Sequence, residues 1–260
     1  MKIVVCVKQV PNTADVRIDQ TTGTMIREGV ESIINPDDLG GLEAALRIKD
    51  QHKAEVIALS MGPLQADGAL RECLAMGADR AILVSDRAFA GADTWATSYV
   101  LAKAIEKIDP DLIIAGRQAI DGDTAQVGPQ IAEHLHLPSV AYVNQIKYDK
   151  QHFIVKRMFE DGYQKVKVKT PCLITVLKEI NQPRYMRVQR IYNAFREGLV
   201  EVWDNSNLKI EQENLGLKGS PTRVKKSYTK GVKTAGKVFD VNPKEAVQII
   251  VDKLKESYIL

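Results

Sequence analysis

Cysteine and histidine are scarce in this chain, and this scarcity limits the disulfides and metal sites that it could form. The 260 residues include three cysteines, Cys6, Cys73 and Cys172, and four histidines. The cysteines are odd in number, far apart and set among apolar residues, so we expect reduced core thiols and no disulfide framework. His134 and His136 form the one close histidine pair, and no cysteine or H-E-x-x-H pattern accompanies them. We therefore expect no metal.

Long apolar runs are also missing. The opening MKIVVCVKQ has only a short apolar run before Lys8, too brief for the apolar region of a signal peptide. No segment approaches the length needed to cross a bilayer. These features predict a cytoplasmic protein with no membrane insertion.

Charge of one sign is not in large excess, because the formal net charge is only +3. Basic residues are nevertheless concentrated between Leu215 and Phe239, where no acidic residue occurs. Tyr228 is the single aromatic residue of that segment before Phe239, so nucleic-acid bases would have little to stack on. The weak apolar periodicity predicts an extended arm, and we expect no nucleic-acid partner.

Strand-like apolar runs and helical patterns alternate as far as Leu135. The patterns predict strands at 3–7, 55–59, 81–84 and 111–115. They also predict helices after Asn35-Pro36, at 67–76, at 93–108 with Asp93 or Thr94 as the cap, and ending near Leu135. Residues 16–26, with Gly23 in the turn, resemble a hairpin-like insertion. For the last of these helices two starts are open, a capping box of Asp123 with Gln126 or a cap at Gly128 before Pro129. The alternation predicts an α/β fold with a mostly parallel, doubly wound sheet.

After Pro138 the pattern becomes β-rich, and hairpins are expected to extend the sheet. The runs are residues 140–148, 153–158, 166–169 and 172–177. Near the end, Asn242, Pro243 and Glu245 provide a cap, a first-position proline and a third-position acid for a C-terminal helix. We expect an α/β nucleotide-binding domain with a β-rich extension at 1–200, and an arm plus helix at 201–260.

The most informative segment is GRQAIDGDTAQVGP, residues 116–129, which follows the apolar run at 112–115. Glycines at the carboxyl end of a buried parallel strand let the backbone approach a ligand, and open α/β sheets bind nucleotides there. Backbone N–H groups and Arg117 suit a phosphate, whereas Asp121 and Asp123 suit ribose hydroxyls or loop N–H groups. The spacing matches neither G-x-G-x-x-G nor a P-loop. An ordinary strand-to-helix turn, with glycines needed only for tight geometry, is the alternative.

This segment closely resembles the signature of the electron transfer flavoprotein beta subunit. The resemblance extends over nearly the whole chain, because other family segments occur in the expected order. These are VKQVP at 7–11, Asn35-Pro36, SMGP at 60–63, LAMGADR at 74–80 and NQPRY at 181–185. The resemblance implies a fold like that of the adenine-nucleotide alpha-hydrolases, and a beta subunit whose C-terminal region wraps an alpha subunit in a heterodimer.

The resemblance also implies a site for an adenine nucleotide. In the family this nucleotide is AMP with a structural role or, in electron-bifurcating members, FAD that receives hydride from NADH. Gly122 and Thr124 replace an acidic residue and a cysteine of many AMP-type members, and Pro129 also resembles the bifurcating type, so FAD is favoured and AMP is the alternative. No residue is expected to be catalytic, because the chemistry belongs to the flavin. The matching cofactor-binding positions are Cys6, Asn35, Pro36, Asp37, Asp38, Met61, Gly116, Arg117, Gln118, Ala119, Ile120, Asp121, Gly122, Asp123, Thr124, Ala125, Gln126 and Val127.

A second functional region is predicted at residues 181–199, where apolar residues mostly follow helical spacing and arginines occupy the other side. Ordinary core packing of an amphipathic helix would explain this pattern. The resemblance implies instead a loop that docks a partner dehydrogenase of the acyl-CoA type. Val188 replaces the longer leucine of mitochondrial-type members, and Met158 replaces a glutamate near their flavin. The implied docking residues are Asn181, Pro183, Arg184, Tyr185 and Val188.

Three functions remain open from the sequence. The first is a beta subunit that transfers electrons by bifurcation, with ferredoxin or flavodoxin as one acceptor. The second is a beta subunit that holds AMP only for stability. The third is an independent enzyme on the same architecture, such as an adenylating ligase or a phosphate-binding stress protein. That enzyme would need a lysine or P-loop-like group at the phosphates, for which Arg117 alone is thin support.

Overall fold

The computed structural model describes residues 1–12, 31–196, 198–225 and 236–260. The chain forms two compact units, Met1–Lys225 and Lys226–Leu260. The division lies later than the sequence-based boundary at residue 200, because residues just beyond 200 add a strand to the main sheet. The expected hairpin at 16–26 lies outside the described residues.

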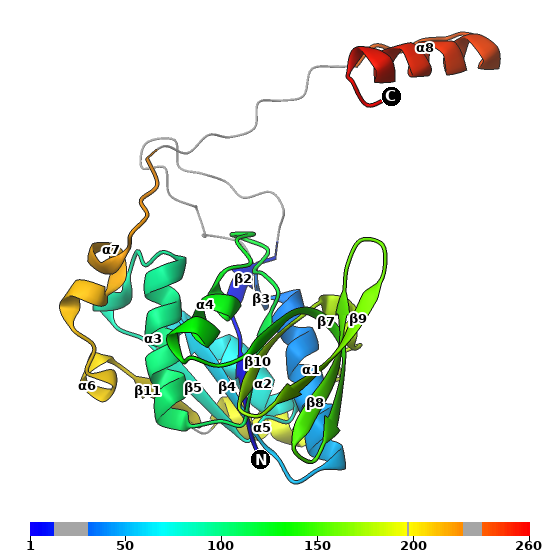
Figure 1. Ribbon diagram of the computed structural model, residues 1–260. Coiled ribbons are helices and arrows are strands. Elements are labelled where there is room, and N and C mark those ends of the chain that lie inside the picture. Colours follow the sequence, from blue (N-terminus) through cyan, green and yellow to red (C-terminus); the bar gives the residue numbers. More distant parts are fainter. Residues whose placement is uncertain (13–30, 197, 226–235) are drawn as a thin grey trace. The chain divides into compact units, whose positions relative to one another are not determined.

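A nine-stranded sheet forms the centre of the first unit (Figure 1). Its strands are β1 (Lys2–Cys6), β4 (Glu55–Met61), β5 (Arg80–Val84), β6 (Leu112–Gly116), β7 (Ser139–Asp149), β8 (His152–Met158), β9 (Tyr163–Lys169), β10 (Cys172–Val176) and β11 (Val200–Trp203). Their order in the sheet is β11-β5-β4-β1-β6-β10-β7-β8-β9. The pairs from β11 through β7 are parallel, and β8 and β9 extend the sheet as antiparallel hairpins. The predicted mostly parallel sheet is therefore confirmed.

Helices cover both faces of this sheet, as the alternating pattern predicts. The helices of the first unit are α1 (Pro36–Gln51), α2 (Asp67–Met76), α3 (Thr94–Ile108), α4 (Val127–His134), α5 (Val188–Arg196), α6 (Asn205–Leu208) and α7 (Gly216–Gly219). The second unit contains α8 (Pro243–Glu256). Short 3-10 turns lie at Leu64–Ala66, Arg87–Phe89, Lys178–Ile180 and Gln212–Asn214. A separate antiparallel pair joins β2 (Gln9–Pro11) to β3 (Ser32–Ile34).

Strand periodicity divides the core into two layers. In β1, Ile3 and Val5 face the core under α1 and α2, whereas Val4 and Cys6 face the core under α3 and α4. All four side chains are buried, as expected for a central parallel strand with helices on both faces. Cys6 therefore lies at the carboxyl end of a central strand, next to the predicted site.

The caps show where local sequence fixed a helix start. Asp93 accepts a hydrogen bond from the N–H of Ala96 over 3.0 Å and begins α3. Asn242 accepts from the N–H groups of Lys244 and Glu245, each over 3.1 Å, and begins α8. Both caps confirm the sequence-based interpretation.

Helix α4 differs from both predicted starts. It begins at Val127, its N-cap is Gln126, and no side chain caps it. Neither Asp123 nor Gly128 is therefore the cap. The oxygen of Asp123 instead accepts from the Gln118 amide over 2.7 Å, within the loop.

The β-rich region also differs from the expectation in one strand. Residues 172–176 do not extend an outer hairpin but form β10, which pairs in parallel with both β6 and β7. Every residue of β10 is buried. A strand buried on both faces is a continuous apolar run, and its short sequence does not reveal its neighbours.

Candidate functional site

The carboxyl ends of β1, β4, β5 and β6 open into one cleft of about 790 Å³. The chain passes from β1 through β4 to β5, then crosses by α3 to β6 on the other side of β1. Such a reversal of strand order is the place where open α/β sheets bind ligands. The volume is in the usual range for small-molecule and cofactor sites. The loop after β6, residues 117–126, contributes much of its lining.

Asn35, directly before α1, holds this loop in place through two hydrogen bonds to its backbone. Its amide nitrogen donates to the backbone oxygen of Gln118 over 2.8 Å, and its oxygen accepts from the N–H of Ile120 over 3.1 Å. Asn35 is fully buried. The residue therefore satisfies two loop backbone groups that would otherwise need other partners.

Asp38, in the first turn of α1, joins the loop to β1. Its two oxygens accept from the N–H of Gly116 over 3.0 Å and from the N–H of Lys8 over 2.8 Å. Burial raises the pKa of Asp38 to about 7, against the hydrogen bonds from Lys8, Asn35 and Gly116 that favour the charged form. A glycine is required opposite it, because a Cβ on Gly116 would lie 2.2 Å from Asp38 Oδ1 and 3.0 Å from the Asp38 backbone nitrogen.

Most charges of the loop are already paired. Lys8 Nζ contacts the Asp121 carboxylate at 2.6 Å, and Arg117 Nε lies 3.6 Å from Asp37 Oδ2. In the part of the chain that the structure describes, Arg87 lines the cleft without a carboxylate partner. Arg87 is thus the basic side chain of the cleft that is available to an anionic ligand.

The structure brings together thirteen of the predicted cofactor-binding residues as lining of the cleft. They are Cys6, Asp38, Met61, Gly116, Arg117, Gln118, Ala119, Gly122, Asp123, Thr124, Ala125, Gln126 and Val127. The other five, Asn35, Pro36, Asp37, Ile120 and Asp121, do not line it. Asn35 and Asp121 hold the loop through the contacts above, and Asp37 accepts from the N–H of Lys178 over 3.0 Å. Asn35, Asp37 and Asp121 therefore hold the cleft-lining segments in position without lining the cleft themselves.

Sequence reasoning missed one wall of the cleft, formed by the segment between β5 and α3 and by the first turns of α3. Residues 85–87, 89–94, Thr97 and Leu101 contribute to it. The signal was present, since β5 is a parallel strand and its carboxyl end must meet the same edge of the sheet as that of β6. This segment contains no motif of its own, and only the strand order places it beside the loop.

The site leaves room beside Gly122. A Cβ on this residue would meet nothing within 4 Å, whereas one on Gly128 would lie 2.6 Å from Thr175 Cγ2. Gly128 is therefore required by packing of α4 against β10. Gly122 is not required by local packing.

Cys6 borders the cleft but is a weak nucleophile. Burial, with a smaller contribution from the charge of Asp38, raises the pKa of its thiol to about 12. All three cysteines are buried and free, which confirms the predicted core thiols. The reactive form is the thiolate, so a pKa this high suppresses reactivity at neutral pH.

We expect Cys6 to be alkylated by iodoacetamide at pH 8 about a thousandfold or more slowly than a free cysteine, because its thiolate is so rare. The rate should rise about tenfold per pH unit between pH 8 and pH 11, as long as the chain stays folded. Mass spectrometry of the peptide containing Cys6 measures both quantities. Labelling as fast as that of the unfolded chain at pH 8 would contradict the raised pKa.

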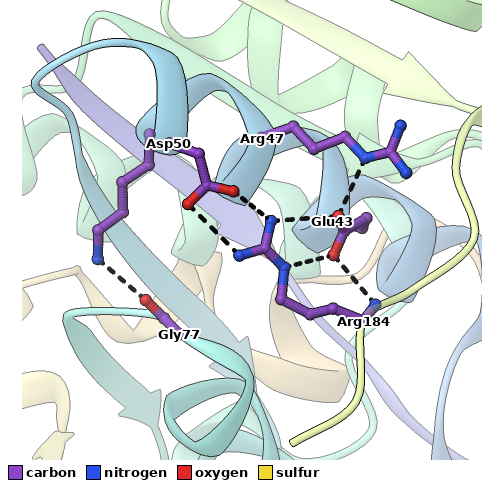
Figure 2. Close-up of polar contacts among 6 residues, drawn as sticks. Glu43, Arg47, Asp50, Gly77 and Arg184 are labelled. Atoms are coloured by element: carbon purple, nitrogen blue, oxygen red, sulfur yellow. Dashed lines mark hydrogen bonds and ion pairs between the residues drawn. The ribbon is translucent and has the colours of Figure 1, made fainter.

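A second surface is formed by residues 181–196, which lie on α1 and α2. Ala194 is buried and Ile191 is half-buried, so the expected core packing holds for these two. The remaining apolar side chains of the pattern are exposed, and Tyr185 and Val188 are 93% and 83% exposed. Arg184 points towards α1, where it contacts Glu43 and Asp50 (Figure 2). Asn181 and Pro183 are half-buried at the start of the segment.

The described residues were also compared with the requirements of a metal site and of a membrane-spanning helix. Across residues 1–12, 31–196, 198–225 and 236–260, no group of three or more His, Cys, Asp and Glu side chains is placed to hold a metal ion. No helix within those same ranges is both long and apolar enough to cross a membrane.

Comparisons with known proteins agree on one family. The electron transfer flavoprotein domain matches residues 22–207. The chain is 56% identical to the electron transfer flavoprotein subunit beta of Clostridium acetobutylicum over 260 residues, covering all of both chains. It is 52% identical over 263 residues to the caffeyl-CoA reductase-Etf complex subunit CarD of Acetobacterium woodii, again covering all of both chains. The acryloyl-CoA reductase electron transfer subunit gamma of Anaerotignum propionicum is 47% identical over 268 residues, with all of both chains covered.

Proposed function

Because this chain belongs to the electron transfer flavoprotein family and is a beta subunit that acts in electron transfer, we propose that its cleft binds FAD and that it bifurcates electrons from NADH. The observation that carries the proposal is the cleft at the ends of four strands, whose loop is held by Asn35 and Asp38. The relatives named for caffeyl-CoA reductase and acryloyl-CoA reductase complexes support a partner that acts on acyl-CoA compounds. The proposal includes a cytoplasmic location, which buried reduced thiols favour.

The residues present fit an adenine dinucleotide. The end of β6 packs closely on the start of α1 because Gly116 has no side chain, and this packing places the loop after β6 along the cleft. The uncapped first turn of α4 favours an anion. Arg87 offers a charge to the phosphates, and Gly122 leaves space that a larger side chain would occupy. When bound, FAD would accept a hydride from NADH and pass its two electrons singly to two acceptors. The chain itself binds, orients and shields this group.

The test is to extract the cofactors from the purified heterodimer of this chain with its alpha subunit and to identify them by mass. Two FAD per heterodimer would support the proposal. One FAD with one AMP would show instead that the beta subunit holds a structural nucleotide. Absence of any adenine nucleotide from this chain would refute both.

Arg87 provides a prediction for the cleft. Replacing Arg87 with glutamine removes its charge while keeping a polar chain of similar length, so nucleotide affinity should fall roughly tenfold to a hundredfold. Equilibrium dialysis of the stripped heterodimer against FAD and AMP measures this loss. Lys209→Gln, at a residue that does not line the cleft, is the control for charge alone. Equal affinities for wild type and Arg87→Gln would remove Arg87 from the site.

The surface at 181–196, hereafter the docking segment, is proposed to bind the dehydrogenase. Its exposed Tyr185, Val188, Tyr192 and Phe195 provide apolar anchors, and arginines surround them. Aromatic and arginine side chains are the residues that dominate binding energy at interfaces. An electron carrier needs such a surface to present its flavin to several partners in turn. Ferredoxin or flavodoxin is the expected second acceptor.

A further inference from the structure

We propose that Glu43 and Asp50 of α1 are positioning residues, which hold the docking segment in its binding shape through Arg184. This inference rests on the proposed docking role of that segment. The resemblance implies that Arg184 contacts the partner directly. In the structure its guanidinium is turned inward to α1 and is held by two carboxylates (Figure 2).

The contacts form a clamp on a single residue. Glu43 Oε2 accepts from the backbone N–H of Arg184 over 3.1 Å and from its Nε over 2.8 Å, and Glu43 Oε1 accepts from its Nη2 over 3.2 Å. Asp50 Oδ2 accepts from the same Nη2 over 2.7 Å. One carboxylate thus fixes both the main chain and the side chain of Arg184. The carboxylate of Asp50, farther along α1, binds the outer nitrogen of the same guanidinium.

Burial makes the inner contact strong. Glu43 is only 3% exposed. Burial alone would raise its pKa, but the hydrogen bonds from Arg184 and Arg47 outweigh burial, and the pKa of Glu43 lies below its usual value. The hydrogen bond from Arg184 likewise lowers the pKa of Asp50. Both groups are therefore charged at neutral pH, and charge-assisted bidentate contacts are the strongest hydrogen bonds a protein forms.

Other contacts hold the docking segment farther along. The N–H of Arg187 donates to the backbone oxygen of Ala75, at the end of α2, over 3.3 Å. The Arg71 guanidinium donates to the backbone oxygen of Ala194. These contacts attach the middle and the end of the segment to α2. Arg184 is the point at which its beginning is attached to α1.

Three of the exposed anchors, Tyr185, Val188 and Tyr192, occur between these attachments. Tyr185 directly follows the clamped residue, and Val188 begins α5 one helical turn later. Without the clamp, the turn before α5 would have to be ordered when the partner binds, and that ordering lowers affinity. The clamp removes this cost in advance. Loss of the clamp should therefore weaken docking without changing electron transfer inside the bound complex.

The decisive variant is Glu43→Gln, and Arg47→Gln is its matched control. Glutamine keeps the shape of residue 43 but removes its charge and one acceptor. Arg47 pairs with the same carboxylate at 3.0 Å, and among the described residues no hydrogen bond or ion pair joins Arg47 to the docking segment. Arg184→Lys is a second variant for the case in which Glu43→Gln fails to fold, because lysine keeps the charge and lacks the fork.

Two measurements on the full heterodimer test the clamp. Hydrogen exchange of the peptide covering residues 184–191 should be roughly tenfold faster in Glu43→Gln than in wild type, and unchanged in Arg47→Gln. The KM for a purified flavin-dependent acyl-CoA dehydrogenase that accepts electrons from the wild type should rise about tenfold at unchanged kcat. Arg184→Lys should shift both quantities in the same direction.

A third variant separates this inference from the docking proposal. Val188→Asp should raise the same KM with no change in hydrogen exchange, since it alters an anchor and leaves the clamp intact. An unchanged KM in Val188→Asp would overturn the docking role of the segment. Wild-type exchange in both Glu43→Gln and Arg184→Lys would overturn the clamp, whatever the result for Val188→Asp.

Discussion

Replacing Gly116 with alanine should strongly weaken nucleotide binding by the heterodimer. The added Cβ would lie 2.2 Å from Asp38 Oδ1, 2.8 Å from Asp37 Cβ and 3.0 Å from the Asp38 backbone nitrogen. Rotation of the Asp38 side chain relieves only the first of these overlaps, because the other two atoms belong to the start of α1. Either α1 or the end of β6 must move. Both elements are in the buried core, where overpacking costs about 1 to 3 kcal/mol.

The larger effect should be on the site. Moving residue 116 away from Asp38 breaks the 3.0 Å hydrogen bond to its N–H and shifts the loop that Asn35 holds. We expect nucleotide affinity to fall roughly a hundredfold or more, since several backbone contacts would be lost together. The nucleotide content of the purified heterodimer, determined by mass, measures this loss, and thermal unfolding measures the change in stability.

Gly122→Ala is the matched control for the stability measurement. The same added methyl group meets nothing within 4 Å there, so stability should change by no more than about 0.5 kcal/mol. Full nucleotide content in Gly116→Ala would show that the loop tolerates displacement. The assignment of the cleft would then be wrong.

The second large effect is expected from removal of residues 226–260. Within the second unit no described residue of α8 is buried, and the apolar residues Val247 and Ile250 lie at helical spacing. An amphipathic helix whose own unit does not cover its apolar face needs a partner, and we propose that this partner is the alpha subunit. Chains ending at Lys225 should bind alpha roughly a hundredfold or more weakly. Titration of the separated subunits, followed by light scattering or fluorescence, gives the affinity.

The position of the cut matters because the residues just before it belong to the α/β unit. The N–H of Asp93 donates to Ser220 Oγ over 2.8 Å, and Asp93 Oδ2 accepts from the hydroxyl of Thr222 over 2.7 Å. Leu215 is buried. A chain ending at Asn214 would lose these contacts with the start of α3, so its weaker binding would have two causes. Full affinity for alpha in the chain ending at Lys225 would refute the wrapping role.

The sequence by itself predicted the elements whose signals are local. The helix at Asp67–Met76 has its expected bounds, and the caps at Asp93 and Asn242 are confirmed, because a cap needs only a side chain and the next few N–H groups. The loop after β6 was also predicted, since an apolar run followed by glycines marks the carboxyl end of a buried strand. A strict periodicity or a cap is a short-range property. Both can be recognised in the sequence without knowing which other strands and helices pack against the element.

Only the tertiary structure decided which segments meet. It placed β10 between β6 and β7, and it brought the segment between β5 and α3 into the cleft. It also paired Arg184 with Glu43 and Asp50, which are far away in sequence. The physical reason is that strand order and ion pairing depend on packing over long separations in the chain, where many pairings satisfy the same local pattern. The sequence predicted a set of site residues, but which of them line the cleft, which lie behind the lining, and which other segments meet them depended on the fold.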